Sequence, residues 1–318
     1  MLAGFHDYAP SEGSFREAVL KGLSSVPKSV PSKWIYDERG SHLFEAVCEA
    51  PEYYPTRIEI ELLSNYANEI AELAGRDCAI VEFGSGAGQK TRLLLDALIH
   101  PIVYVPVDID GKTLRRSAES IAIDYPEISV TPVRADITRS FPLPGTIKGV
   151  KGKKLGFFPG TTIGNFETEQ ACSFFKMCAE MLEGGGLIVG ADLQKEAAVL
   201  EAAYNDSDGA CPNFNLNLIT RINEELDGNL NKNAFQHSAI YQESAGRMNI
   251  GIRSTCQQSA RIAGQNFEFG KDEIIRTQVS YKYTIDGFQE LAKHSGLEPL
   301  HAWKDDARLF SLHYFRAP

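Results

Sequence analysis

Short apolar runs alternate with helix-length amphipathic stretches through the middle of this chain. The runs are AIVEF at 79–83, IVYVPVD at 102–108, ISVTPVR at 128–134, KLGFFPG at 154–160 and GLIVGAD at 186–192. Runs that are rich in Val and Ile and flanked by Gly or Pro are typical of parallel strands buried on both faces. The segments between them, such as TRLLLDAL, KTLRRSAESIAI and ACSFFKMCAEML, have the apolar spacing of helices. The alternation predicts a doubly wound α/β domain.

The pattern differs on either side of this region. Residues 1–78 are largely helical in character, and residues 196–284 combine a helix, asparagine-rich polar stretches (NDSDGACPNFNLN and ELDGNLNKN) and strand-like segments around 237–254 and 273–283. The last residues return to a helix, IDGFQELAKHSG, and two strand candidates around 298–304 and 308–315. We therefore expect an N-terminal segment over 1–60 that joins a second domain, an α/β core over 61–195, a second α+β domain over 196–284, and a return to the core over 285–318. The second domain is expected to cover the mouth of the sheet.

Composition narrows the classes of partner. The 318 residues carry a net charge of −10, which argues against a nucleic-acid partner because such proteins usually present a basic patch. The first residues lack the features of a signal peptide, and no apolar run is long enough to span a membrane, so we expect a cytoplasmic protein without a membrane partner. The six cysteines form no C-x-x-C pair or zinc-type spacing, so reduced thiols and no metal site are expected.

The candidate chemistry begins where the first strand ends. VEFGSGAGQKT carries Glu82 at the end of the strand and then Gly84, Gly86 and Gly88 in a turn that leads into a helix. Glycines adopt torsion angles that a Cβ forbids and let a ligand approach the backbone, and a helix N-terminus offers N–H donors to a carboxylate. A nicotinamide fingerprint needs a third small residue at position 89, which is Gln. The spacing resembles instead motif I of class I S-adenosylmethionine methyltransferases.

Two more acids follow the next two strands. Asp108 ends the second strand, where a carboxylate can accept both hydroxyls of a ribose, and Asp110 is a local competitor for that role. Asp136 follows the third strand in VRADIT, where it can accept from an adenine amino group while Ile137 packs on the ring. All of these acids fall at the carboxyl edge of the predicted sheet, where open α/β folds bind ligands.

Longer motifs make the resemblance specific. KWIYDERGSHLFEAV (33–47), PEYYPTR (51–57), EFGSGAGQKTRLLLDAL (82–98), YVPVDID (104–110), FPGTTIGNF (158–166), SYKYT (280–284) and DARLFSLHY (306–314) are similar to segments of the histidine-specific Nα-methyltransferases of ergothioneine biosynthesis. The similarity runs nearly end to end. It implies a doubly wound class I methyltransferase core with a second α+β domain that recognises the amino acid. It also implies trimethylation of free L-histidine to its betaine, hercynine. Separately, we expect the protein to be a monomer.

The resemblance further implies positions that bind S-adenosyl-L-methionine, which leaves as S-adenosyl-L-homocysteine. These cofactor positions are Glu82, Gly84, Gly86, Gly88, Lys90, Asp108, Asp136 and Ile137. Lys90 would face the carboxylate of the methionine moiety.

Substrate positions carried over in the same way are Tyr54, Gly160, Asn165, Tyr204, Ile250, Gln278 and Ser280. Asn165 would meet the acceptor amine or carboxylate, and Tyr54 and Tyr204 would hold the substrate backbone. Gln278 and Ser280 would grip the side chain, with Ile250 as an apolar wall. Tyr36, from the YDERG motif, would line the same cavity and is, with Asn165, a catalytic position.

Two of these positions depart from the family pattern. The family has Glu where this chain has Gln278, and commonly Met where it has Ile250. A carboxylate can pair with an imidazole N–H, whereas an amide offers only neutral hydrogen bonds. Histidine is the first expectation for the acceptor. Another aromatic amino acid, such as tryptophan, tyrosine or a derivative, is the alternative, because related fungal enzymes methylate tryptophan or its derivatives. A catalytically silent, cofactor-binding relative is the second alternative.

Overall fold

The computed structural model describes residues 2–8, 14–86 and 88–318. The other positions, which include parts of the predicted N-terminal segment and of the glycine-rich loop, lie outside the described residues. The chain forms two compact units: unit 1 comprises Met1–Ala9, Pro55–Gln194 and Tyr281–Pro318, and unit 2 comprises Pro10–Tyr54 and Lys195–Ser280. The predicted boundaries at residues 60, 195 and 284 lie a few residues from those of the units. The beginning of the chain differs from the expectation, because strand β1 (His6–Asp7) pairs with a strand of unit 1.

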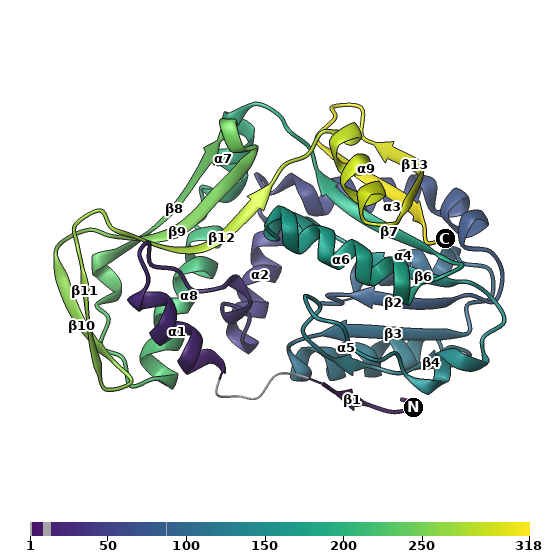
Figure 1. Ribbon diagram of the computed structural model, residues 1–318, viewed down its shortest axis with the longest axis horizontal. Coiled ribbons are helices and arrows are strands. Elements are labelled where there is room, and N and C mark those ends of the chain that lie inside the picture. The colour runs from purple at the N-terminus through teal and green to yellow at the C-terminus, as the bar shows by residue number, and fades with distance from the viewer. Residues whose placement is uncertain (1, 9–13, 87) are drawn as a thin grey trace. The chain divides into compact units, whose positions relative to one another are not determined.

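Unit 1 is built on one mostly parallel sheet (Figure 1). Its strands lie in the order β1-β5-β3-β2-β6-β7-β14-β13, with β4 beside β3, and only β14 and β13 run antiparallel to their neighbours. The strands are β2 (Ala79–Phe83), β3 (Val103–Asp108), β4 (Ser129–Val130), β5 (Val133–Arg134), β6 (Lys154–Phe158), β7 (Gly186–Asp192), β13 (Glu298–Lys304) and β14 (Phe310–Arg316). The predicted third strand, ISVTPVR, is divided into β4 and β5, because Pro132 between them has no N–H to donate to a neighbouring strand.

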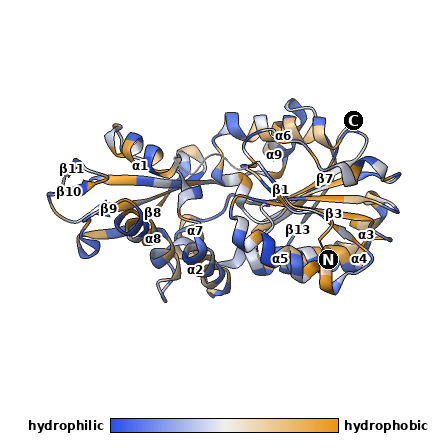
Figure 2. Ribbon diagram, turned by 90° about the horizontal axis from the view of Figure 1, so that it is seen from below, coloured by the Kyte–Doolittle hydropathy of each residue, from blue (hydrophilic) through white to orange (hydrophobic). Residues whose placement is uncertain are grey.

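Helices cover both faces of this sheet. They are α3 (Tyr54–Ala74), α4 (Gln89–Ala97), α5 (Gly111–Asp124), α6 (Thr168–Met181) and α9 (Ile285–His294), with short 3-10 turns η2 (Gly145–Gly149) and η3 (Thr162–Asn165). Figure 2 shows α3, α4 and α5 on one side and α6 and α9 on the other. Val81 and Phe83 of β2 pack with Phe174 of α6, whereas Ile80 packs with Leu62 of α3. Alternate residues thus serve opposite faces that are both buried, which explains the continuous apolar runs.

Unit 2 is α+β. Its helices are α1 (Ser14–Ser24), α2 (Glu38–Glu49), α7 (Ala197–Tyr204) and α8 (Ala210–Glu225), with the 3-10 turns η1 (Ser32–Trp34), η4 (Lys232–Ala234) and η5 (Glu243–Ala245). Its strands are β8 (Phe235–Gln242), β9 (Arg247–Ser254), β10 (Gln258–Ile262), β11 (Gln265–Phe269) and β12 (Ile274–Tyr281). They form a three-stranded sheet in the order β12-β9-β8 and a separate β10-β11 hairpin.

Helix α8 corrects an expectation. The sequence over 205–217 is a polar, asparagine-rich stretch with no helix predicted in it, yet from Ala210 onward it is helical. The reason lies in the buried Asn215, whose Nδ2 donates to the carbonyl oxygen of Gly251 at 2.8 Å while its Oδ1 accepts from the Thr277 hydroxyl at 2.7 Å. Because these amide groups are satisfied by β9 and β12, asparagine can occupy the inner face of a helix.

Within the residues that the structure describes, no helix is both long and apolar enough to cross a membrane. In the same part of the chain, no group of three or more His, Cys, Asp or Glu residues is arranged to hold a metal ion.

Candidate active site

The glycine-rich loop after β2 has the backbone that its composition predicts. Gly84, Gly86 and Gly88 have φ values of 74°, 48° and 76°, all in the left-handed region that favours glycine. Apart from chain neighbours, no described atom lies within 4 Å of the place that a Cβ would take at Gly84 or Gly86. Among the described residues, the Ser85 hydroxyl has no hydrogen-bond partner, although Ser85 is only 5% exposed. The loop therefore combines open space above its backbone with a buried, unpaired hydroxyl.

The topology places this loop at the switch point of the sheet. Strand β2 has β3 on one side and β6 on the other, and the chain winds away from β2 in both directions. The N–H of Gly84 donates to the carbonyl of Val107 at 2.8 Å, which ties the loop to the carboxyl end of β3. Ligands of doubly wound folds bind in the crevice at such a point.

Asp108 lies beside the loop, at the end of β3. Its carboxylate accepts from the N–H of Gly86 at 3.3 Å and from the N–H of Asp110 at 3.0 Å. Burial raises the pKa of the Asp108 carboxyl, although the residue keeps some exposure. Asp110 is the N-cap of α5, where it accepts from the N–H of Lys112 at 3.0 Å and from the Thr113 hydroxyl at 2.5 Å. Capping is an ordinary use of aspartate at a helix start, and it leaves Asp108 as the carboxylate next to the glycine loop.

The next acid, Asp136, follows β5 and is buried. Its Oδ1 accepts from the backbone N–H of Thr138 at 3.0 Å and from the Thr138 hydroxyl at 2.6 Å. Ile137 is partly buried against the core beneath α6 and α9. The turn is thus fixed by its own hydrogen bonds.

Glu82 is positioned differently from the other acids. It is wholly buried, and its carboxylate accepts from the Thr91 hydroxyl at 3.0 and 2.7 Å and from the Tyr104 hydroxyl. Burial raises the pKa of Glu82 to about 7, despite these hydrogen bonds and the nearby charge of Lys90, which lower it. Its contacts join β2 to the first turn of α4 and to β3, so Glu82 supports the glycine loop from beneath.

Lys90, at the start of α4, forms an ion pair with Glu59 of α3, a residue that the sequence analysis missed. Both Glu59 oxygens also accept from the N–H of Gly160, at 2.7 and 2.9 Å. Gly160, in the turn after β6, has a φ of 81°. A signal for Glu59 existed in the sequence: it shares a helix face with Leu62 and Leu63, so an acid stands in an otherwise apolar stripe. Asn165 ends η3 in the same segment and is half-buried.

The remaining predicted residues belong to unit 2. The hydroxyls of Tyr204 and Ser280 lie 2.9 Å apart and are both buried, which joins α7 to β12. Tyr54 accepts a hydrogen bond of 2.6 Å from Lys195 Nζ, which also lies 4.5 Å from the centre of the tyrosine ring. Tyr36 packs edge-on against Phe44 and Phe214, at 5.5 and 5.1 Å between ring centres.

Gln278 and Ile250 lie on neighbouring strands of unit 2. Gln278 is half-buried on β12, two positions before Ser280, so the two side chains point to the same face of the strand. Ile250 on β9 is buried, and its carbonyl accepts from the Thr277 hydroxyl at 3.2 Å. The structure thus joins Tyr204 to Ser280 and sets Gln278 on the strand face of Ser280, and Tyr36 packs against two phenylalanines.

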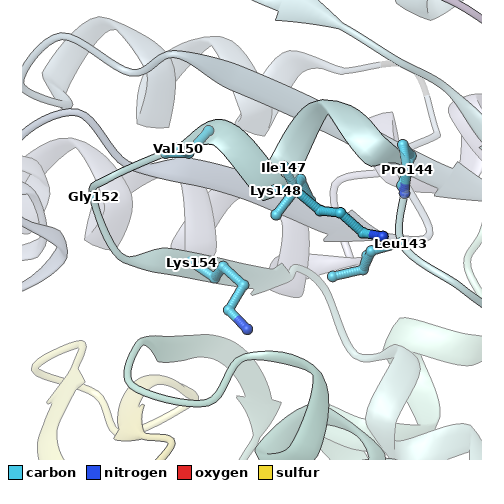
Figure 3. A pocket seen from close by; sticks show the side chains of 7 residues that line it. All are labelled: Leu143, Pro144, Ile147, Lys148, Val150, Gly152 and Lys154. Carbon is cyan, nitrogen blue, oxygen red and sulfur yellow. The ribbon is translucent and has the colours of Figure 1, made fainter.

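A hollow elsewhere in unit 1 is unrelated to these residues. It lies at the amino end of β6 and is lined by Leu143, Pro144, Ile147, Lys148, Val150, Gly152 and Lys154 (Figure 3). Lys154 begins β6, whereas Gly160 follows its end. The hollow therefore opens at the edge of the sheet opposite to the glycine loop.

Comparison with known proteins identifies the family. A family described as histidine-specific, S-adenosylmethionine-dependent methyltransferases matches residues 15–317. The chain belongs to this family. It is 35% identical over 305 residues to the histidine N-alpha-methyltransferases of Mycolicibacterium smegmatis and Mycobacterium tuberculosis, covering 94% of this chain and 94% of each relative. It is 27% identical to the 4-dimethylallyltryptophan N-methyltransferase easF of Claviceps purpurea, covering 93% of this chain and 92% of that protein.

The residues around the glycine loop fit the cofactor of this methyltransferase family. S-adenosylmethionine carries a ribose, an adenine and an amino-acid end. The loop offers the open backbone at Gly84 and Gly86, the unpaired hydroxyl of Ser85 and the carboxylate of Asp108. These groups can accept from and donate to the hydroxyls and amines of such a ligand. The class I methyltransferase core expected from the sequence is thus confirmed.

Proposed function

We propose that this protein transfers methyl groups from S-adenosyl-L-methionine to the α-amino group of free L-histidine and forms the trimethylated betaine, hercynine, as a step of ergothioneine biosynthesis. The observation that carries the proposal is the identity of 35% with two histidine N-alpha-methyltransferases over 94% of both chains. A relationship of this extent includes unit 1 and unit 2, so it includes the residues expected to bind the cofactor and those expected to bind the amino acid.

The cofactor, when bound, supplies a methyl group that is already activated by its attachment to a positively charged sulfur. The residues of unit 1 have to hold and orient it. Asp108 would accept hydrogen bonds from the ribose hydroxyls, Asp136 would accept from the adenine amino group, and Ile137 would pack on the ring. Lys90 would face the methionine carboxylate. Alignment of the reactants is the main demand of such a transfer, since good orientation alone removes several kcal/mol (roughly 7–11) from a barrier.

The acceptor amine must be neutral before each transfer. Burial disfavours the ammonium form, so a site that excludes water lowers the pKa of the amine, and no strong base is required. Asn165 forms a hydrogen bond with the amine or the carboxylate of the amino acid, and Tyr36 lines the site. Tyr54 and Tyr204 hold the backbone of the amino acid, and tyrosine faces attract the methylated cations by about 0.5–2 kcal/mol each. The Lys195 ammonium already lies over the ring of Tyr54, which is an example of this attraction.

We also propose that the enzyme acts as a monomer in the cytoplasm, where free amino acids and the cofactor occur. Size-exclusion chromatography with light scattering tests the first point, and cell fractionation tests the second.

The decisive experiment supplies the protein with the cofactor and each free amino acid in turn, and detects products by mass spectrometry. Histidine should gain up to three methyl groups. Cofactor binding by calorimetry without turnover of any amino acid would instead support a catalytically silent relative.

A different aromatic acceptor is the second candidate, and Gln278 favours it. An amide makes only neutral hydrogen bonds, so it lacks the charge-assisted bond with imidazole that a carboxylate makes, a difference of about 1–2 kcal/mol. The relative from Claviceps purpurea, which is 27% identical to this chain, is named for methylation of a tryptophan derivative.

Exchanging the amide for a carboxylate separates these candidates. If histidine is the acceptor, Gln278→Glu should lower its KM roughly tenfold, most clearly near pH 6 where imidazolium is populated. If tryptophan or tyrosine is the acceptor, the same change should raise KM, because it places a charge beside an apolar ring. Michaelis constants for the three amino acids with both proteins measure this. A higher KM for histidine in the variant would contradict the first candidate.

A further inference from the structure

Glu59 places a fully buried carboxylate among the residues expected to bind the cofactor and the acceptor. Its side chain has no exposed surface, pairs with Lys90, and accepts from the N–H of Gly160 through both oxygens, at 2.7 and 2.9 Å. It is not one of the positions that the family resemblance implies. Three segments far apart in the sequence, α3, the start of α4 and the turn after β6, meet at this single group.

Burying a carboxylate is costly unless its charge is compensated and its lone pairs are occupied. The Lys90 ammonium supplies the opposite charge, and the Gly160 N–H supplies a donor. The Lys90 side chain is 19% exposed, so it lies at the border between the interior and solvent. The pair therefore joins a fully buried carboxylate to a lysine side chain that keeps some access to solvent.

The surrounding chain is shaped to admit this contact. A Cβ at Gly190 of β7 would lie 2.6 Å from Glu59 Oε1 and 2.7 Å from the carbonyl oxygen of Gly160, closer than real side chains approach. Gly160 itself needs its left-handed φ of 81° to present its N–H in the turn. Glycine at both positions lets the carboxylate and the turn come together.

We propose that Glu59 is a positioning residue for methyl transfer. Its buried carboxylate fixes Lys90 and the turn after β6 relative to each other. The inference rests on the proposed function. An ammonium has three donors, and the bond to Glu59 fixes the direction of the others toward a bound carboxylate. The bond to Gly160 fixes the turn that leads through η3 to Asn165. Glu59 thus couples the cofactor end of the site to the segment expected to meet the acceptor.

The test combines Glu59→Gln with Lys90→Met. Glu59→Gln keeps the size of the side chain and removes its charge. It should weaken the binding of S-adenosylhomocysteine about tenfold by calorimetry and lower kcat/KM for histidine at least tenfold. In a Lys90→Met background, the same change should leave the binding of S-adenosylhomocysteine unaltered, because its effect passes through Lys90. It should still lower kcat/KM for histidine, because the bond to Gly160 is affected independently.

Glu69→Gln is the matched control. Glu69 lies on the same helix and accepts from Trp303 Nε1 at 2.9 Å, and this variant should keep both parameters at wild-type values. If Glu59→Gln does not fold, Glu59→Asp is the substitute variant. It retains the negative charge but shortens the side chain by one methylene, and it should reduce kcat/KM for histidine. Wild-type binding and kinetics in a folded Glu59 variant would overturn the proposal. The proposal would also be overturned if Glu59→Gln weakened the binding of S-adenosylhomocysteine equally in the wild-type and Lys90→Met backgrounds. If the wild-type protein binds S-adenosylhomocysteine but methylates no amino acid, the proposed function fails, whereas the binding comparison still decides the role of Glu59.

Discussion

The aspartate that ends β3 and the one two residues later have different surroundings, and these surroundings indicate different roles. Asp108 is bonded to the glycine loop through Gly86, whereas Asp110 is bonded to the first turn of α5 through Lys112 and Thr113. The first arrangement suits a carboxylate that meets a ligand at the loop. The second stabilises a helix.

Replacing each aspartate should therefore have a different effect. Asp108→Ala should weaken the binding of S-adenosylmethionine by about 1.5–3 kcal/mol, the range for hydrogen bonds to a charged group. Asp110→Ala should lower the free energy of unfolding by about 1 kcal/mol through the lost cap, but keep cofactor affinity. Calorimetry and urea unfolding measure the two quantities. Equal affinity of wild-type protein and folded Asp108→Ala would contradict the assignment.

Glu82 should make stability depend on pH. Its pKa is about 7 in the folded protein against an ordinary value of 4.5, because burial disfavours the charged form. Between pH 4.5 and pH 7, Glu82 is therefore protonated in the folded protein and deprotonated in the unfolded chain. The contribution is fully present below pH 4.5 and is lost as pH rises through 7, by on the order of 3 kcal/mol.

Glu82→Gln should remove this dependence. Urea unfolding at pH 5 and pH 8 should show a smaller difference between the two pH values in the variant than in the wild-type protein. Glu69→Gln, the same exchange elsewhere in unit 1, should keep the wild-type difference. Identical pH dependence of wild-type protein and Glu82→Gln would show that Glu82 does not titrate in this range.

The sequence predicts the acids at the sheet edge better than it predicts their partners. Asp108 and Asp136 follow recognisable strands, so their positions follow from the strand pattern alone. Glu59 is different, because its partners Lys90 and Gly160 are distant in sequence and only the folded sheet brings them together. The contacts of Glu82 with Thr91 and Tyr104 escaped prediction for the same reason.

At the scale of elements, the glycine loop allows a test that separates folding from binding. Gly84 and Gly75 have nearly equal φ values, 74° and 76°, and neither would place a Cβ within 4 Å of a described atom beyond its chain neighbours. Gly75 follows the end of α3 and precedes β2, whereas Gly84 follows β2, so the two glycines lie beyond opposite ends of that strand.

Alanine at either position should cost about 1–2 kcal/mol of stability, because a Cβ disfavours the left-handed region. Only Gly84→Ala should also weaken S-adenosylmethionine binding, at least tenfold, because its Cβ would occupy the space above the loop. Thermal unfolding and calorimetry on both variants measure this. A loss of affinity in Gly75→Ala of the same size would mean that strain, and not the loop surface, sets affinity.

The accuracy of the predicted elements follows from how each element is buried. Strands β2, β3, β6 and β7 are covered on both faces, so their sequences are continuous apolar runs that mark their positions closely. Helix α8 was missed because its inner face carries Asn215 and Asn217, whose burial depends on partners outside the helix. The β10-β11 hairpin was not predicted, because its two strands are short and each contains only two buried apolar residues among polar ones.

At the scale of the whole molecule, the expected roles divide between the units. All expected cofactor residues lie in unit 1, together with Gly160 and Asn165, whereas the residues expected to recognise the side chain and backbone of the amino acid lie in unit 2. Each ligand should therefore protect different backbone amides from hydrogen exchange, because a bound ligand suppresses local opening where it binds.

Hydrogen exchange should show this division. S-adenosylhomocysteine alone should slow exchange in the glycine loop and the start of α4, and in the segments that follow β3 and β5. Histidine added to that complex should slow exchange further in unit 2, around Tyr204 in α7 and along β12 near Ser280. The segment around η2 that lines the hollow of Figure 3 is the internal control and should be unchanged by either ligand. Protection by S-adenosylhomocysteine in that segment, with none in the glycine loop, would move the cofactor to the opposite edge of the sheet. Protection by histidine without any change in unit 2 would contradict the assignment of the acceptor residues to that unit. Gln278 would then not determine which amino acid is methylated.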